Sequence, residues 1–142
     1  MAGAGIVAIL SGLMMSVQGV FNTNLKNAAG AWFTNTLTHG VGFLLSLLIL
    51  WCVRDTDVIG LRAVNKFYLL GGVLGVGIVY TVIVSITKMG PAKATMVILI
   101  TQMTASYIIQ LFGLFGMERA SFSFSKVLGI GLMLAGIVVF QR

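Results

Sequence analysis

The chain has 142 residues, of which 58% are hydrophobic and 8% charged, and its mean hydropathy of +1.07 is far above that of ordinary water-soluble domains. This composition predicts an all-α integral membrane protein and excludes a separate soluble domain. The net charge of +6 comes from lysines and arginines placed singly between apolar runs, where such residues commonly bound membrane helices, so a nucleic-acid partner is not expected.

Five apolar segments separated by short polar breaks approach the roughly 20 residues that a membrane-spanning helix needs. The first has no basic residue ahead of it, so we expect a transmembrane helix there and not a cleaved signal peptide. The sequence therefore predicts a multi-pass protein of the inner or plasma membrane, surrounded by the lipid bilayer. Its single transmembrane domain, residues 1–142, has five predicted spans, at about residues 4–21, 31–53, 67–87, 92–115 and 124–140.

The first predicted span carries a polar stripe. Its members recur at helical spacing and therefore share one face, which leads from the middle of the membrane to one surface. They are Ser11, Met15, Gln18 and Asn22.

The second predicted span has Trp32 and Trp51 near its ends, where aromatic side chains anchor helices at membrane interfaces. Asn35 and His39 share a face, and at a rise of about 1.5 Å per residue His39 lies about 12 Å from the start of the span. Two interpretations remain open for this histidine. It is either a proton-coupling group, because imidazole titrates near neutral pH, or a neutral side chain bonded to Asn35 or a neighbouring helix.

Small residues spaced four apart mark two other spans and favour close helix packing, within the bundle or across a dimer interface. They are Gly71 and Gly75 in the third span, and Gly131 and Ala135 in the fifth.

The fourth predicted span carries Gln102, Ser106 and Gln110 on one helical face. Lipid cannot satisfy an amide, so this face must meet protein, water or a ligand. Hydrogen bonds between helices and the lining of a transport path are both compatible with the spacing.

From the helix directions, Gln18, His39, Tyr80 and Gln102 are expected to converge near the middle of the membrane. Amide, hydroxyl and imidazole groups offer both donors and acceptors, which suits a small polar solute that is neutral, zwitterionic or weakly anionic. Gln110 lies further along and is assigned to a gate or a secondary position. The predicted binding residues are Gln18, Asn22, His39, Tyr80, Gln102 and Ser106.

Enzymatic chemistry is not expected. One histidine, one cysteine and three acidic residues, the acidic ones all in predicted loops, cannot build a clustered metal site. A nucleotide-binding glycine loop is also missing from the sequence. We therefore predict no catalytic residues, no metal and no cofactor.

Basic residues are divided almost evenly between the two sides of the predicted topology. The side of the N-terminus receives five, namely Arg54, Arg62, Lys66, Arg119 and Lys126, and the other side receives Lys26, Lys88, Lys93 and Arg142. Orientation normally follows a clear excess of Lys and Arg in cytoplasmic loops. Either other features fix one orientation, or the chain inserts both ways and a second copy completes an antiparallel homodimer.

The segments SVQGVFNTNLK, THGVG, TQMTAS, IIQLFGLFG and KVLGIGLMLAGIVV resemble the YdcZ-type family of inner-membrane exporters, in the drug/metabolite transporter superfamily. The resemblance covers essentially the whole chain. It implies five helices that form half of an inverted-repeat transporter and pair with another half. Gln18, Asn22 and Gln102 match polar positions of the family, whereas Gln110 stands where an aspartate is common and His39 where an apolar residue is usual.

Together these features predict a secondary transporter, an exporter of a small polar metabolite or toxicant, that works by alternating access as an antiparallel homodimer. Two alternatives stay open. The same dimer could form a passive channel, or the chain could be one subunit of a heterodimeric transporter.

Overall fold

The structure is a computed structural model that describes residues 2–53 and 65–140. The predicted loop that holds Asp55 and Asp57 falls mostly outside these residues. Contacts divide the chain into two compact units, Met1–Lys88 and Met89–Arg142, which are described in turn.

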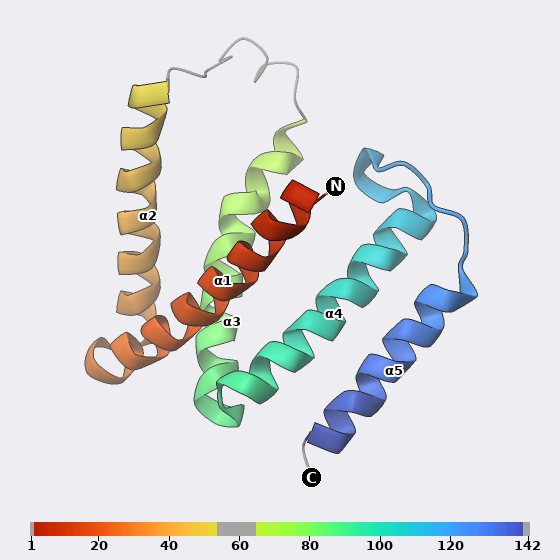
Figure 1. Cartoon of the computed structure of the whole chain (residues 1–142). Helices are drawn as coiled ribbons and strands as arrows, with labels where there is room; N and C mark the ends of the chain where they lie inside the picture. The colour runs from red at the N-terminus through yellow and green to blue at the C-terminus, as the bar shows by residue number, and fades with distance from the viewer. Residues whose placement is uncertain (1, 54–64, 141–142) are drawn as a thin grey trace. The chain divides into compact units, whose positions relative to one another are not determined.

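All regular structure in the described part of the chain is helical, as the composition predicts (Figure 1). Four segments are long and apolar enough to cross a membrane, and α5, with 17 residues, is a shorter apolar helix. The five α-helices are α1 (Ala2–Ala29), α2 (Ala31–Val53), α3 (Gly71–Met89), α4 (Pro91–Phe112) and α5 (Phe124–Phe140), and the 3-10 helix η2 (Lys66–Leu70) leads into α3.

Helix α1 is longer than the predicted first span, since it continues past Phe21 to Ala29. It ends at Gly30, whose φ of 84° is readily adopted by glycine, and the Gly30 N–H donates to the carbonyl of Lys26 at 2.8 Å. The Gly30 carbonyl then accepts from the backbone N–H of Thr34, so one glycine ends α1 and begins α2.

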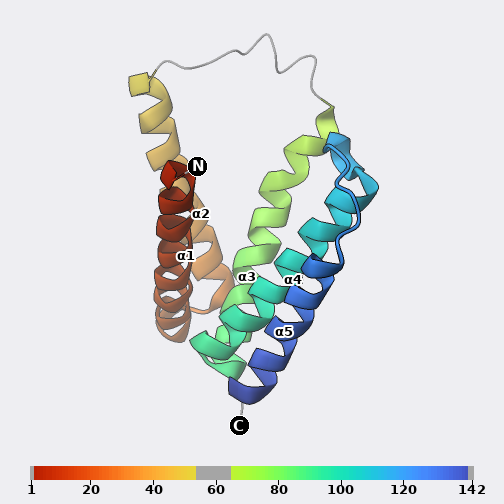
Figure 2. The ribbon, with the colours of Figure 1, turned by 45° about the vertical axis from the view of Figure 1, so that its right-hand side comes forward.

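In the first unit, the C-terminal ends of α1 and α3 lie near the N-terminal end of α2 (Figures 1 and 2). Gly19 permits the close approach of α1 and α3, because a Cβ there would lie 2.8 Å from Cδ1 of Ile86. Toward their other ends α2 and α3 diverge, and the side chains of residues 41–53 on α2 are all exposed. The hydrogen bonds that side chains of α2 make to α1 and α3 lie in the first half of α2, at Asn35 and Thr38.

Large apolar side chains point outward along the helices, among them Ile9 at 66%, Leu44 at 65% and Val139 at 73% exposure. A water-soluble helical protein would bury such side chains, whereas a bilayer covers them without cost. The outward apolar surface agrees with the predicted membrane location.

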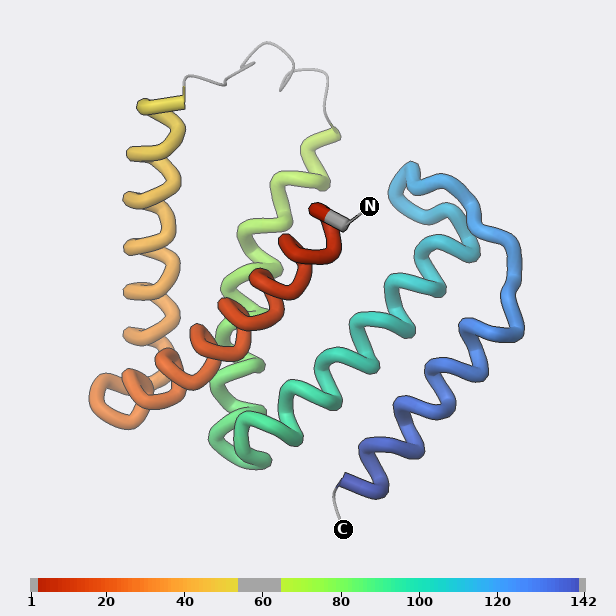
Figure 3. The backbone as a smooth tube through the Cα atoms, in the orientation of Figure 1, coloured from red at the N-terminus to blue at the C-terminus, as the bar shows by residue number. Residues whose placement is uncertain are grey.

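In the second unit, α4 and α5 form an antiparallel pair whose connection can be followed in Figure 3. Helix α4 ends at Phe112, three residues before the predicted end of the span, because Gly113 adopts a left-handed conformation with φ 63°. The Tyr107 hydroxyl accepts from the backbone N–H of Ser123 at 2.9 Å, and Arg119 Nε donates to the Phe112 carbonyl at 3.2 Å. These bonds tie the connection to α4.

Candidate functional site

Several hydroxyl groups in the described helices are satisfied by a nearby backbone carbonyl along the same helix. Thr34 donates to the Gly30 carbonyl at 2.9 Å, and Thr81 donates to the Gly77 carbonyl at the same distance. An amide or imidazole is not satisfied in this way, so its partner must come from another helix or from a ligand. Five further hydroxyl groups also donate to the backbone carbonyl four residues earlier, those of Ser11, Thr23, Thr36, Thr87 and Thr101.

Asn22 joins α1 to α2. Its side chain is 8% exposed, and its Oδ1 accepts a hydrogen bond of 2.9 Å from the hydroxyl of Thr38. The predicted polar stripe of the first span therefore includes a bond between helices at its buried end. Thr38 is unusual among the threonines here because its hydroxyl bonds another helix.

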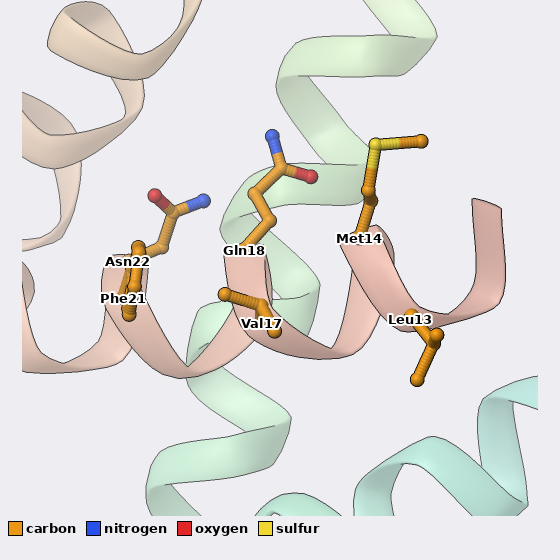
Figure 4. A pocket seen from close by; sticks show the side chains of 6 residues that line it. All are labelled: Leu13, Met14, Val17, Gln18, Phe21 and Asn22. Carbon is orange, nitrogen blue, oxygen red and sulfur yellow. The ribbon is translucent and has the colours of Figure 1, made fainter. Parts of the chain in front are cut away.

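Gln18 lies one turn before Asn22 and lines an open pocket of about 390 Å³ on α1. In Figure 4, Met14, Gln18 and Asn22 extend from the same side of the helix, as their spacing of four residues requires. The pocket is mostly apolar, with two amides at one end. Its lining residues are Leu13, Met14, Val17, Gln18, Phe21 and Asn22.

Three contacts in a row join α2 to α3. The rings of Trp32 and Tyr80 are stacked, with centroids 4.6 Å apart and an interplanar angle of 17°. One turn along, Asn35 Nδ2 donates to the backbone carbonyl of Val76 at 2.8 Å. One turn further, a Cβ placed on Gly75 would lie 3.4 Å from His39 Cε1, so the glycine allows the imidazole to lie against the α3 backbone.

This row contains two buried polar atoms that have no hydrogen-bond partner among the described residues, Asn35 Oδ1 and His39 Nε2. The Asn35 side chain is 2% exposed. A buried polar atom without a partner costs about 1–3 kcal/mol, so such atoms are uncommon and are commonly satisfied by a bound water, ion or ligand. The α2–α3 contact is therefore the strongest candidate for a polar solute site in the first unit.

The structure places the predicted residues of the fourth span in the second unit, where Gln102, Ser106 and Gln110 are all exposed on α4. The backbone carbonyl of Gln110 accepts from the N–H groups of Gly113 at 3.3 Å and Ala120 at 3.0 Å. Gln110 thus takes part in the connection to α5 through its backbone. Convergence of Gln102 with the residues of the first unit stays a prediction.

Among the predicted packing glycines, Gly75 lies against His39, whereas a Cβ on Gly71 or Gly131 would meet no other heavy atom within 4 Å among the described residues. The role predicted for Gly131 and Ala135 at a dimer interface stays a prediction.

Sequence reasoning did not assign Asn35 or Trp32 to the site. The signal for Asn35 was present, since it shares a helical face with His39. Trp32 was interpreted as an interface anchor, and its stacking on Tyr80 depends on a residue 48 positions away in the chain, which no local pattern reveals.

Comparison with known proteins identifies the family. The chain matches the family model described as "Putative inner membrane exporter, YdcZ" over residues 4–139, a range that covers nearly the whole chain. No curated protein and no solved structure gives a significant match. The family is one of transporters and not of enzymes, and its members are inner-membrane proteins. With five apolar helices and buried amides between them, the chain belongs to the YdcZ family of inner-membrane exporters of the drug/metabolite transporter superfamily.

Proposed function

We propose that this exporter moves a small polar metabolite or toxicant by alternating access, around a site built from amide, hydroxyl and imidazole groups. The observation that carries the proposal is the pair of buried atoms on Asn35 and His39 that have no hydrogen-bond partner in the described part of the chain. The site is proposed to include Gln18, Asn22, His39 and Tyr80 from the first unit, with Gln102 and Ser106 from the second.

The character of the site supports a solute without a strong net charge. The only acidic residues of the chain are Asp55, Asp57 and Glu118, and all three lie outside the predicted spans. A cation that needs a carboxylate partner in the membrane therefore has none available from this chain. Amides and a neutral imidazole supply donors and acceptors in similar numbers.

The decisive experiment is a transport screen of the purified protein in proteoliposomes, over a panel of small polar solutes. Saturable uptake with counterflow of labelled solute is expected, whereas conduction without exchange would show a channel. A protein that moves nothing by itself would instead favour the heterodimeric alternative.

Gln102→Leu is expected to reduce uptake to background, because leucine removes the amide and keeps a similar volume. Thr101→Val is the matched control, since the Thr101 hydroxyl bonds its own helix. Unchanged uptake by Gln102→Leu would exclude Gln102 from the pathway.

We also propose that two copies of the chain assemble antiparallel. The nearly even division of basic residues, five against four, supports insertion in both orientations. An antiparallel pair of five-helix chains would reproduce the inverted repeats that many transporters carry in one chain.

Cys52 provides the test of orientation, because it is the sole cysteine and is exposed near the end of α2. An impermeant thiol reagent added outside sealed inverted or right-side-out cell vesicles is expected to label about half of the molecules in either case. Permeabilised vesicles give the total that can be labelled. Complete labelling from one side and none from the other would show a single orientation.

A further inference from the structure

The orientation of the Asn35 amide is fixed by its neighbour. The Val76 carbonyl can only accept, so the atom that contacts it at 2.8 Å must be the amide nitrogen. The unpartnered atom is then the carbonyl oxygen Oδ1, an acceptor. This assignment follows from chemistry and does not depend on how the amide is placed.

His39 adds a second buried polar atom to the same contact. His39 lies one helical turn beyond Asn35 on the same face of α2, and its Nε2 is buried without a partner among the described residues. When the ring is neutral and its proton is on Nδ1, Nε2 is an acceptor. Residues four apart on a helix have Cβ atoms about 5–6 Å apart.

One nitrogen carrying at least two N–H groups fits between two such acceptors. With hydrogen bonds of about 2.9 Å to each, the acceptors would be separated by about 5 Å. A single O–H group, by contrast, satisfies only one of the two. An acceptor group such as a carboxylate would be repelled by both.

We propose that Asn35 Oδ1 and His39 Nε2 together recognise the NH₂ or NH₃⁺ group of the transported solute, so that the substrate class is neutral primary amides and zwitterionic primary amines. This inference rests on the proposed function, because it names the solute chemistry of the same site. The stacked rings of Trp32 and Tyr80 lie one turn away. Because both acceptors are buried, access of the solute requires the α2–α3 contact to open, as alternating access would do.

The test is ligand-observed saturation-transfer NMR on the full chain in nanodiscs, which reports binding without requiring transport. The probes are acetamide, methylammonium and N,N-dimethylacetamide, each detected through its methyl protons. A protein-dependent signal is expected for acetamide, methylammonium or both, and none above empty nanodiscs for N,N-dimethylacetamide, which has no N–H. The probe that binds tells whether the neutral or the charged group is preferred.

Variants then locate the binding. Asn35→Leu and His39→Phe are each expected to weaken binding about tenfold or more, through the loss of one hydrogen bond to the solute. Thr36→Val, an exposed neighbour whose hydroxyl bonds its own helix, is expected to bind as the wild type does. His39→Phe keeps the ring, so it remains informative if Asn35→Leu fails to fold.

Equal signals for acetamide and N,N-dimethylacetamide, no signal from either primary probe, or unchanged binding by both variants would overturn the inference. The last two results are expected if the acceptors only hold a structural water. Transport of a solute that lacks N–H groups would leave the proposed function standing and remove this inference. Binding of the probes with no transport of any solute would support recognition of the N–H group at this contact and contradict the proposed transport function.

Discussion

Gly75→Leu is expected to destabilise the first unit and abolish transport. A Cβ at this position would already lie 3.4 Å from His39 Cε1, and the further atoms of leucine have to displace the imidazole. The displacement would also separate Asn35 from the Val76 carbonyl, which leaves a buried amide donor unpaired. Overpacking of this kind costs about 1–3 kcal/mol, and the lost hydrogen bond adds a similar amount.

The measurement is the melting temperature of the purified protein together with solute uptake in proteoliposomes. Gly72→Leu is the matched control, because it is also on α3 and a Cβ there meets nothing within 4 Å among the described residues. Gly75→Ala is expected to remain active, since its Cβ makes only an ordinary contact. If Gly75→Leu were as stable and active as Gly72→Leu, the α2–α3 contact would not be part of the working transporter.

His39→Gln is expected to uncouple transport from a pH gradient. His39 is the only histidine of the chain and lies inside a predicted span, where an ionisable side chain is a candidate for proton coupling. Glutamine keeps a donor and an acceptor but cannot take up a proton. The variant should therefore still exchange solute in counterflow, while losing accumulation driven by an imposed pH gradient.

Both activities are measured on the same proteoliposomes, so counterflow controls for folding and insertion. Thr36→Val serves as a coupled control on the same helix. Accumulation by His39→Gln that still follows the pH gradient would remove His39 from the coupling mechanism and leave it with a role in solute binding alone.

The sequence predicted the number of α-helices in the described residues and their approximate positions. The length of each apolar run determines whether a segment can span the bilayer, and the bounds of α2 and α5 agree with the predicted spans at residues 31–53 and 124–140. The end of α1 was less predictable. The predicted first span ends at residue 21, whereas the helix continues to Ala29 and includes Asn22, which bonds Thr38.

The candidate site was predictable only in part. The helical spacing of the sequence shows which side chains share a face, and it predicts that His39 and Asn35 lie on one face, apart from the lipid-facing residues. It could not show which of the polar groups would be satisfied. Hydroxyls such as those of Thr36 and Thr101 find their partners four residues away in the same helix, whereas Asn35 finds its partner 41 residues away.

The sequence by itself thus determined the membrane class, the helices and the polar faces, because these depend on composition and on the local period of the chain. Only the tertiary structure decided that Asn22 bonds Thr38, that Trp32 stacks on Tyr80, and that one atom each of Asn35 and His39 has no partner within residues 2–53 and 65–140. The physical reason is that a buried amide has to be satisfied by another helix, and the position of that helix is set by packing across the whole unit.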